Sequence, residues 1–172
     1  MKKKNGFTLV ELLAVIVILA LVMVLTIPSI INVMSQARRK TFQEYISKFY
    51  TAAVSQYESD SGILGTIKGA GWYVYDVEND IGLADTGNYK GFIVVNASNV
   101  DEPHFIIELY NDNYMINNYD ITNHKIPDAD STYIKPYSAG TVKTNAYDVC
   151  VQAMGGAGHT CYSRTGFPYL AP

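Results

Sequence analysis

Apolar residues are distributed very unevenly along this chain. Residues 7–27 form one apolar run that is broken only by Thr8, Glu11 and Thr26. An α-helix rises about 1.5 Å per residue, so a run of this length spans a hydrocarbon core of roughly 30 Å. The pattern therefore predicts a membrane-spanning helix. Its one carboxylate, Glu11, lies near the start, where it is costly unless a partner neutralises it.

The helical pattern continues beyond Pro28. Proline lacks an N–H and clashes with the preceding turn, so we expect it to kink the helix without ending it. Apolar residues then recur at helical spacing, namely Phe42, Ile46, Phe49, Ala53 and Tyr57. Such a stripe predicts an amphipathic half-helix over residues 29–60 that packs on a sheet of the same chain. Asp, Ser and Gly at residues 59–62 predict its end.

The remainder of the chain predicts a small sheet. Four glycines in residues 62–71 indicate a loop. Alternating or β-branched runs predict strands at residues 72–77, 91–95, 104–110 and 114–119, and more weakly at 132–135. Residues 147–151 fit a short strand or a helical turn, and Ala146 fits the start of a C-terminal helix. The predicted fold class is α+β: a long N-terminal helix, transmembrane in its first half, packed on a small antiparallel sheet.

Charge is also distributed unevenly, although the net charge of the 172 residues is only −3. Basic residues 2–4 precede the apolar run and basic residues 38–40 follow it. From residue 41 onward 15 acidic residues stand against 7 basic ones. A basic start and an acidic bulk predict a single pass with a cytoplasmic N-terminus. The acidic domain does not favour nucleic acid as a partner. Residues 38–40 fit either contact with lipid headgroups or a solvated helix face.

Two cysteines, Cys150 and Cys161, lie near the C-terminus with ten residues between them. In an exported protein such a pair predicts one disulfide. Reduced thiols and a metal site that also uses His159 are the alternatives, but no further metal ligand is evident.

Catalytic chemistry has little support. His104, His124 and His159 are scattered, and acidic pairs such as Asp101/Glu102 do not differ from ordinary surface acids. We therefore expect no enzyme activity, no cofactor and no metal. Asp and Asn residues between 112 and 130 offer oxygen ligands for calcium, but turn formation is the favoured interpretation.

The N-terminal residues resemble the class III signal of type IV pilins and pseudopilins. Gly6 matches the last leader residue, Phe7 the first mature residue and Glu11 the fifth, and the apolar helix with Pro28 also matches. The resemblance covers roughly residues 1–58. It implies that prepilin peptidase cuts after Gly6 and methylates Phe7, and that the fold ends in a segment closed by a disulfide. The D-P-W-G-like segment of calcium-binding major pseudopilins is missing.

This resemblance gives four segments: a leader at residues 1–6, a transmembrane and assembly helix at 7–28, an amphipathic spine at 29–60 and an extracellular β-rich head at 61–172. The expected function is that of a structural subunit of a type IV pilus or pseudopilus. The expected partners are other pilin subunits, prepilin peptidase, the inner-membrane assembly platform and, before assembly, membrane lipid. The expected location is the bacterial cell membrane and then a surface filament.

Glu11 is the centre of the assembly hypothesis. Cleavage after Gly6 leaves an amine on Phe7, and in a parallel bundle Glu11 of one subunit would pair with the Phe7 amine of its neighbour. Three alternatives remain open. They are a secretory signal peptide cleaved after Ala37, a signal anchor with an incidental glutamate, and a non-polymerising anchored domain that binds an extracellular partner. Major pilin, minor pilin and pseudopilin are not distinguished.

Overall fold

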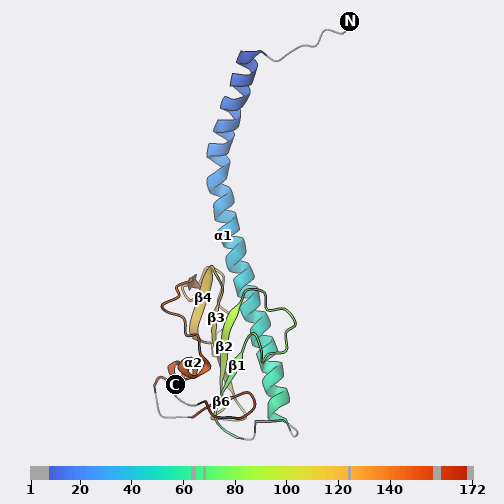
Figure 1. Ribbon diagram of the computed structural model, residues 1–172, viewed down its shortest axis with the longest axis vertical. Coiled ribbons are helices and arrows are strands. Elements are labelled where there is room, and N and C mark those ends of the chain that lie inside the picture. The colour runs from blue at the N-terminus through green and yellow to red at the C-terminus, as the bar shows by residue number, and fades with distance from the viewer. Residues whose placement is uncertain (1–7, 63–64, 68, 124, 157–159, 170–172) are drawn as a thin grey trace. The chain divides into compact units, whose positions relative to one another are not determined.

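The computed structural model describes residues 8–62, 65–67, 69–123, 125–156 and 160–169 (Figure 1). The chain divides into two compact units, residues 1–38 and 39–172. The longest element, α1 (Leu9–Ser61), contributes to both. The α+β fold class predicted from the sequence is confirmed: a long N-terminal helix occurs with a mostly antiparallel sheet.

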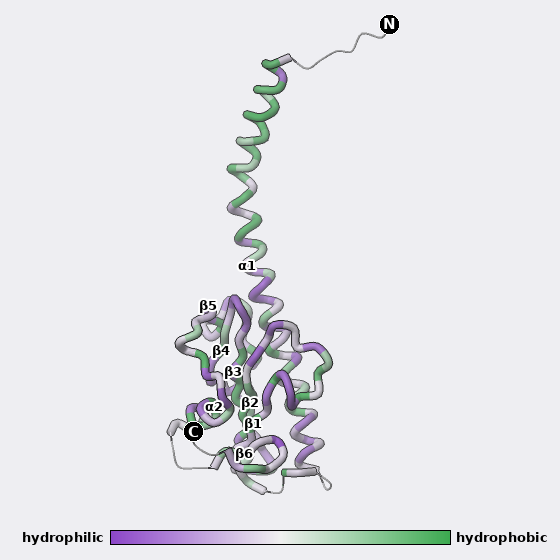
Figure 2. The backbone as a smooth tube through the Cα atoms, in the orientation of Figure 1, coloured by the Kyte–Doolittle hydropathy of each residue, from purple (hydrophilic) through white to green (hydrophobic). Residues whose placement is uncertain are grey.

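The first unit is the apolar part of α1. The helix runs through Pro28 without ending there, as predicted. The large apolar side chains between Leu9 and Met34 are all exposed, and they give this part of the helix its hydrophobic colour in Figure 2. Within the described residues, α1 is the single helix long and apolar enough to cross a membrane.

The second unit is built on the predicted apolar stripe of α1. The five residues of that stripe are all buried, as the helical spacing predicted: Phe42, Ile46, Phe49, Ala53 and Tyr57. They form one core with inward-facing strand residues such as Ile93, Ile107 and Leu109. Burial of both apolar faces is what holds the helix against the sheet.

The sheet has six strands in the order β5-β4-β3-β2-β1-β6. They are listed here in chain order: β1 (Trp72–Asp76), β2 (Lys90–Asn96), β3 (His104–Tyr110), β4 (Tyr114–Asp120), β5 (Lys135–Pro136) and β6 (Cys161–Ser163). β1 to β4 form the predicted antiparallel meander. The weak strand predicted at 132–135 was wrong except for Lys135, and β6, which pairs parallel to β1, was not predicted.

Local side-chain bonds explain the turn between β3 and β4. Asn111 Oδ1 accepts hydrogen bonds from the backbone N–H groups of Asn113 (2.9 Å) and Tyr114 (2.8 Å). An asparagine that bonds to the backbone ahead of it stabilises a tight turn.

Strand β4 contains a bulge. The pairing register between β3 and β4 shifts between Ile107 and Leu109, which places one extra residue in β4, and Asn118 adopts a positive φ of 47° there.

The other face of the sheet carries a smaller core. Val74 and Val94 pack there with Val149 and both cysteines. The covering element is α2 (Ala146–Ala153), so of the alternatives for this region the helix starting at Ala146 is the correct one. Asn145 caps it by accepting a hydrogen bond from the Asp148 backbone N–H at 2.8 Å.

Candidate assembly and processing site

The N-terminus of α1 is closed by a reciprocal pair of side chains. Glu11 Oε2 accepts hydrogen bonds from the backbone N–H and the hydroxyl of Thr8, both at 2.8 Å. In return, the Glu11 backbone N–H donates to the Thr8 hydroxyl oxygen at 3.3 Å. This is a capping box, in which the residue before the helix and the third helical residue satisfy each other's N–H groups.

The capping box supplies Glu11 with hydrogen-bond partners. Its carboxylate accepts hydrogen bonds from Thr8 of its own chain, so the charge in the apolar run is not without a partner. The free N–H groups of the first turn also favour a negative charge at this position. Glu11 is therefore accommodated by hydrogen bonds within its own chain. The T-x-x-E spacing was readable from the sequence, but its capping role was missed.

Two predicted processing residues, Gly6 and Phe7, lie outside the described residues. The pairing of Glu11 with the Phe7 amine of a neighbour therefore stays a prediction. Pro28 lies inside α1, and the kink expected there also stays a prediction.

The rest of the apolar run offers almost no polar atom to a partner. The Thr26 hydroxyl donates to the Val22 carbonyl of its own helix at 3.0 Å. Ala14 and Ala20 are small enough to let a neighbouring helix approach closely. The surface that this segment offers between Glu11 and Pro28 is thus an apolar one, suited to lipid or to other apolar helices.

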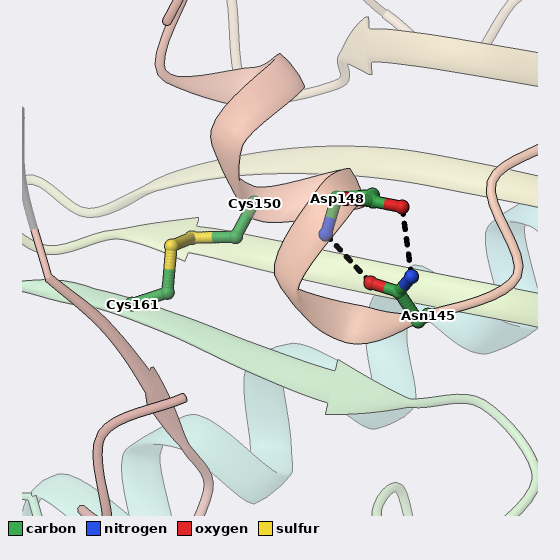
Figure 3. Close-up of a disulfide and its surroundings, with 4 residues drawn as sticks. All are labelled: Asn145, Asp148, Cys150 and Cys161. Carbon is green, nitrogen blue, oxygen red and sulfur yellow. Dashed lines mark hydrogen bonds between the residues drawn. A yellow bond between two sulfur atoms is a disulfide. The ribbon is translucent and has the colours of Figure 1, made fainter. Parts of the chain in front are cut away.

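At the other end of the chain, Cys150 and Cys161 form the expected disulfide (Figure 3). Their Cα atoms are 6.2 Å apart, and both residues are buried. The bond ties α2 to β6 and thereby holds a very short strand at the sheet edge. Part of the intervening loop, including His159, lies outside the described residues.

Arg39 has a role that the sequence did not indicate. Its guanidinium donates to the backbone oxygens of Ala129 (2.6 Å), Ser131 (3.1 Å) and Ile134 (3.0 Å). It also lies over the Tyr114 ring, 5.8 Å from the centroid. Arg39 is therefore committed to the second unit and is not available for lipid headgroups.

A second group that sequence reasoning missed lies at the end of α1. Asp60 is buried and its Oδ2 accepts from Arg164 Nε at 3.0 Å and from the Tyr75 hydroxyl at 3.3 Å. Arg164 also donates to the Asp80 carbonyl at 3.2 Å. These contacts fix the segment after β6 against the helix. The partners are distant in sequence, and no spacing rule would have connected them.

Of the Asp and Asn residues considered as calcium ligands, Asp120 acts as a turn residue and Asp112 bonds a side chain of another segment. Asp120 Oδ1 accepts from the backbone N–H groups of Thr122 (3.0 Å) and Asn123 (3.2 Å). Asp112 Oδ2 accepts from Asn88 at 2.9 Å. Among the residues that the structure describes, no group of three or more His, Cys, Asp or Glu side chains is placed to hold a metal ion.

Comparison with known proteins identifies one feature. Residues 1–27 match the family model of the prokaryotic N-terminal methylation motif. No curated protein and no solved structure matches the chain. The motif belongs to structural proteins of the pilin type and points away from an enzyme family. It implies processing by prepilin peptidase, pilin assembly and membrane anchoring. The chain therefore carries, at residues 1–27, a prepilin signal of the type IV pilin type.

Proposed function

We propose that this protein is a structural subunit of a type IV pilus or of a related pseudopilus filament. The observation that carries the proposal is the junction of two features at one end of the chain. A prepilin signal occupies residues 1–27, and the same residues run into a long helix whose apolar side chains are exposed.

The proposal divides the chain by task. Residues 1–6 are the leader, which prepilin peptidase removes after Gly6. Residues 7–28 anchor the subunit in the bacterial membrane and later form the filament core. Residues 29–60 continue this spine, and residues 61–172 form the head on the filament surface. The basic residues before the apolar run favour a cytoplasmic N-terminus during the membrane stage.

The exposed helix supplies the physical reason for assembly. Outside a membrane, each large apolar side chain between Leu9 and Met34 would face water at a cost of about 1.5–3 kcal/mol relative to burial. A parallel bundle of identical helices removes all of them from water at once. Glu11 then exchanges its capping bonds for the Phe7 amine of a neighbour, and an unpaired charge in the bundle disfavours a wrong register.

A second candidate is an anchored domain that does not polymerise. Exposed tyrosines such as Tyr133 and Tyr137 favour it because amphipathic rings are common in binding surfaces. In this candidate Glu11 has only its capping role, and replacing it leaves the surface display of the head unchanged.

The test replaces Glu11 by alanine in the native host. The filament proposal predicts normal membrane insertion and normal removal of residues 1–6, but strongly reduced recovery of the subunit in sheared surface fibres. Thr26→Val is the matched control, because it also removes a polar group from the apolar run and is expected to assemble normally. Equal recovery of the Glu11→Ala subunit and the unmodified subunit in fibres would contradict the Glu11 pairing. Absence of fibres containing the unmodified subunit would favour the anchored domain.

A further inference from the structure

Glu108 is a buried carboxyl group that the proposed function does not use. It lies on β3, opposite Phe92 of β2, and its exposed fraction is 1%. Its Oε1 atom accepts a hydrogen bond from the Lys143 backbone N–H at 2.8 Å. Its Oε2 atom is buried and has no hydrogen-bond partner within the described part of the chain. Such an unmatched buried oxygen is costly and requires an explanation.

The neighbouring strand carries a second unmatched oxygen. Asn117 lies in the β4 bulge that faces Glu108, and its Nδ2 donates to the Thr141 carbonyl at 3.1 Å. Its Oδ1 atom is also buried without a partner among the described residues. A carbonyl oxygen can only accept, so Thr141 fixes the orientation of this amide and leaves Oδ1 as an acceptor. Both side chains thus bond the same segment, residues 141–143, with one acceptor left over on each.

The groups around Glu108 only partly offset the cost of burying its charge. The backbone N–H and the charge of Lys143 favour the ionised carboxylate, but the Lys143 side chain is exposed and desolvation outweighs it, and Tyr110 on the same strand is a second titratable neighbour. Phe92 of β2 is apolar, and Asp148 of α2 is bonded to Asn145. An ionised Glu108 would therefore be a buried charge with one neutral hydrogen bond, which is strongly unfavourable. If Glu108 Oε2 carried a proton, it could donate a hydrogen bond to Asn117 Oδ1. That one bond would satisfy both unmatched oxygens.

We propose that Glu108 is protonated in the folded head and donates its Oε2–H to Asn117 Oδ1, and that this shared proton latches residues 141–145 onto the sheet. The latch lies directly before α2, which begins at Ala146 and carries Cys150. Release of the segment therefore loosens the helix that carries one cysteine of the disulfide.

The direction of the pH dependence follows from burial. Burial raises the pKa of Glu108 above its ordinary value, because desolvation penalises the charged form. In the unfolded chain the same carboxyl ionises near pH 4.3. Between these two pKa values the folded protein binds one more proton than the unfolded protein, so stability falls as pH rises through that window. The latch is closed in acid and opens as Glu108 ionises.

The direct test is a titration of the side-chain carboxyl carbons by NMR, using the full chain in detergent micelles. The same carboxyl in the chain unfolded by denaturant serves as the reference. We expect Glu108 to titrate at a clearly higher pH in the folded protein than in the unfolded chain, and the Lys143 amide signal of the folded protein to shift with it. A Glu108 carboxyl that ionises at the same pH in both states would overturn the proposal.

A variant gives an independent test. Glutamine at position 108 keeps an acceptor for the Lys143 N–H and places a permanent donor opposite Asn117. We expect Glu108→Gln to fold, to lose the fall in stability that accompanies Glu108 ionisation, and to slow disulfide reduction relative to the unmodified protein at the same alkaline pH. Glu102→Gln is the matched control and should retain the pH dependence. An unchanged pH dependence in Glu108→Gln would overturn the latch. If added calcium kept Glu108 ionised in the folded protein, a cation rather than a proton would occupy the site. That result would also overturn the proposal.

Discussion

At the scale of single residues, Arg39 illustrates how one side chain organises a distant segment. Its planar guanidinium reaches three backbone oxygens of residues 129–134, a stretch with little regular structure of its own. Lysine cannot reproduce this, because an ammonium group lacks the rigid fork of donors. The three oxygens would be left to find water or remain unmatched.

Replacing Arg39 by methionine tests this role. We expect the head to lose about 2 kcal/mol of unfolding free energy, because hydrogen bonds from a charged donor contribute about 1.5–3 kcal/mol and this site is partly open to solvent. Denaturant unfolding followed by Trp72 fluorescence gives the measurement. The matched variant Arg38→Met alters an exposed residue and should leave the transition unchanged. Equal losses of unfolding free energy in the two variants would contradict this role of Arg39.

Thr8 gives a second prediction at this scale. Thr8→Val removes the hydroxyl that bonds Glu11 in both directions, so the first turn of α1 should fray. Hydrogen exchange of the backbone amides of Glu11 and Leu12, measured in detergent micelles, should become faster, because both donate to Thr8. Thr26→Val is the control, since its hydroxyl bonds within the middle of the helix. Unchanged exchange at Glu11 and Leu12 would show that the capping box does not hold the turn.

Single-residue roles were only partly predictable from the sequence. The Thr8–Glu11 spacing follows a local rule, and Glu11 was singled out because a charge is rare in an apolar run. Arg39 and Glu108 depend instead on partners 35 or more positions away. Their partners are backbone groups of irregular segments, and such groups carry no residue-type signal.

At the scale of elements, α1 serves two environments with one continuous helix. Up to Met34 its large apolar residues are exposed, whereas the stripe from Phe42 to Tyr57 is buried under the sheet. Phe49→Ala should therefore lower the unfolding free energy of the second unit by about 3–5 kcal/mol, the usual cost of a large cavity. Val33→Ala, at an exposed position of the same helix, should leave this free energy unchanged. Similar unfolding midpoints for the two variants would contradict this division.

The disulfide acts on the C-terminal elements. Replacing both Cys150 and Cys161 by serine should cost about 3 kcal/mol in a loop of this size. The loss should appear first as faster hydrogen exchange in α2 and β6, because β6 has only three residues. β2 and β3, each seven residues long and paired on both edges, should remain protected. Uniform loss of protection across the sheet would show that the disulfide stabilises the head as a whole.

Elements differed in how well the sequence predicted them. The amphipathic stripe of α1 and the meander β1–β4 follow from periods of 3.6 and 2 with clear turn residues. β5 and β6 are only two and three residues long, so their sequences are too short to show an alternating pattern. The parallel pairing of β6 with β1 joins the two ends of the head, and local sequence does not encode it.

At the scale of the whole molecule, the chain combines an exposed apolar helical segment with a second unit, residues 39–172, that has its own core. Within the described residues, each face of the sheet carries a buried core, and all members of both cores belong to this second unit. In the proposed function, this division lets the apolar helix exchange lipid for other helices while the second unit keeps its fold. The prepilin signal at residues 1–27 implies a processing step by prepilin peptidase.

The most direct test of the central claim is the N-terminus of the protein recovered from sheared surface fibres of its own cells. Mass spectrometry of the intact chain and its first peptide should show that residues 1–6 are absent and that the first residue is Phe7 with a methylated amine. A chain that still begins at Met1, or one that begins after Ala37, would contradict the account.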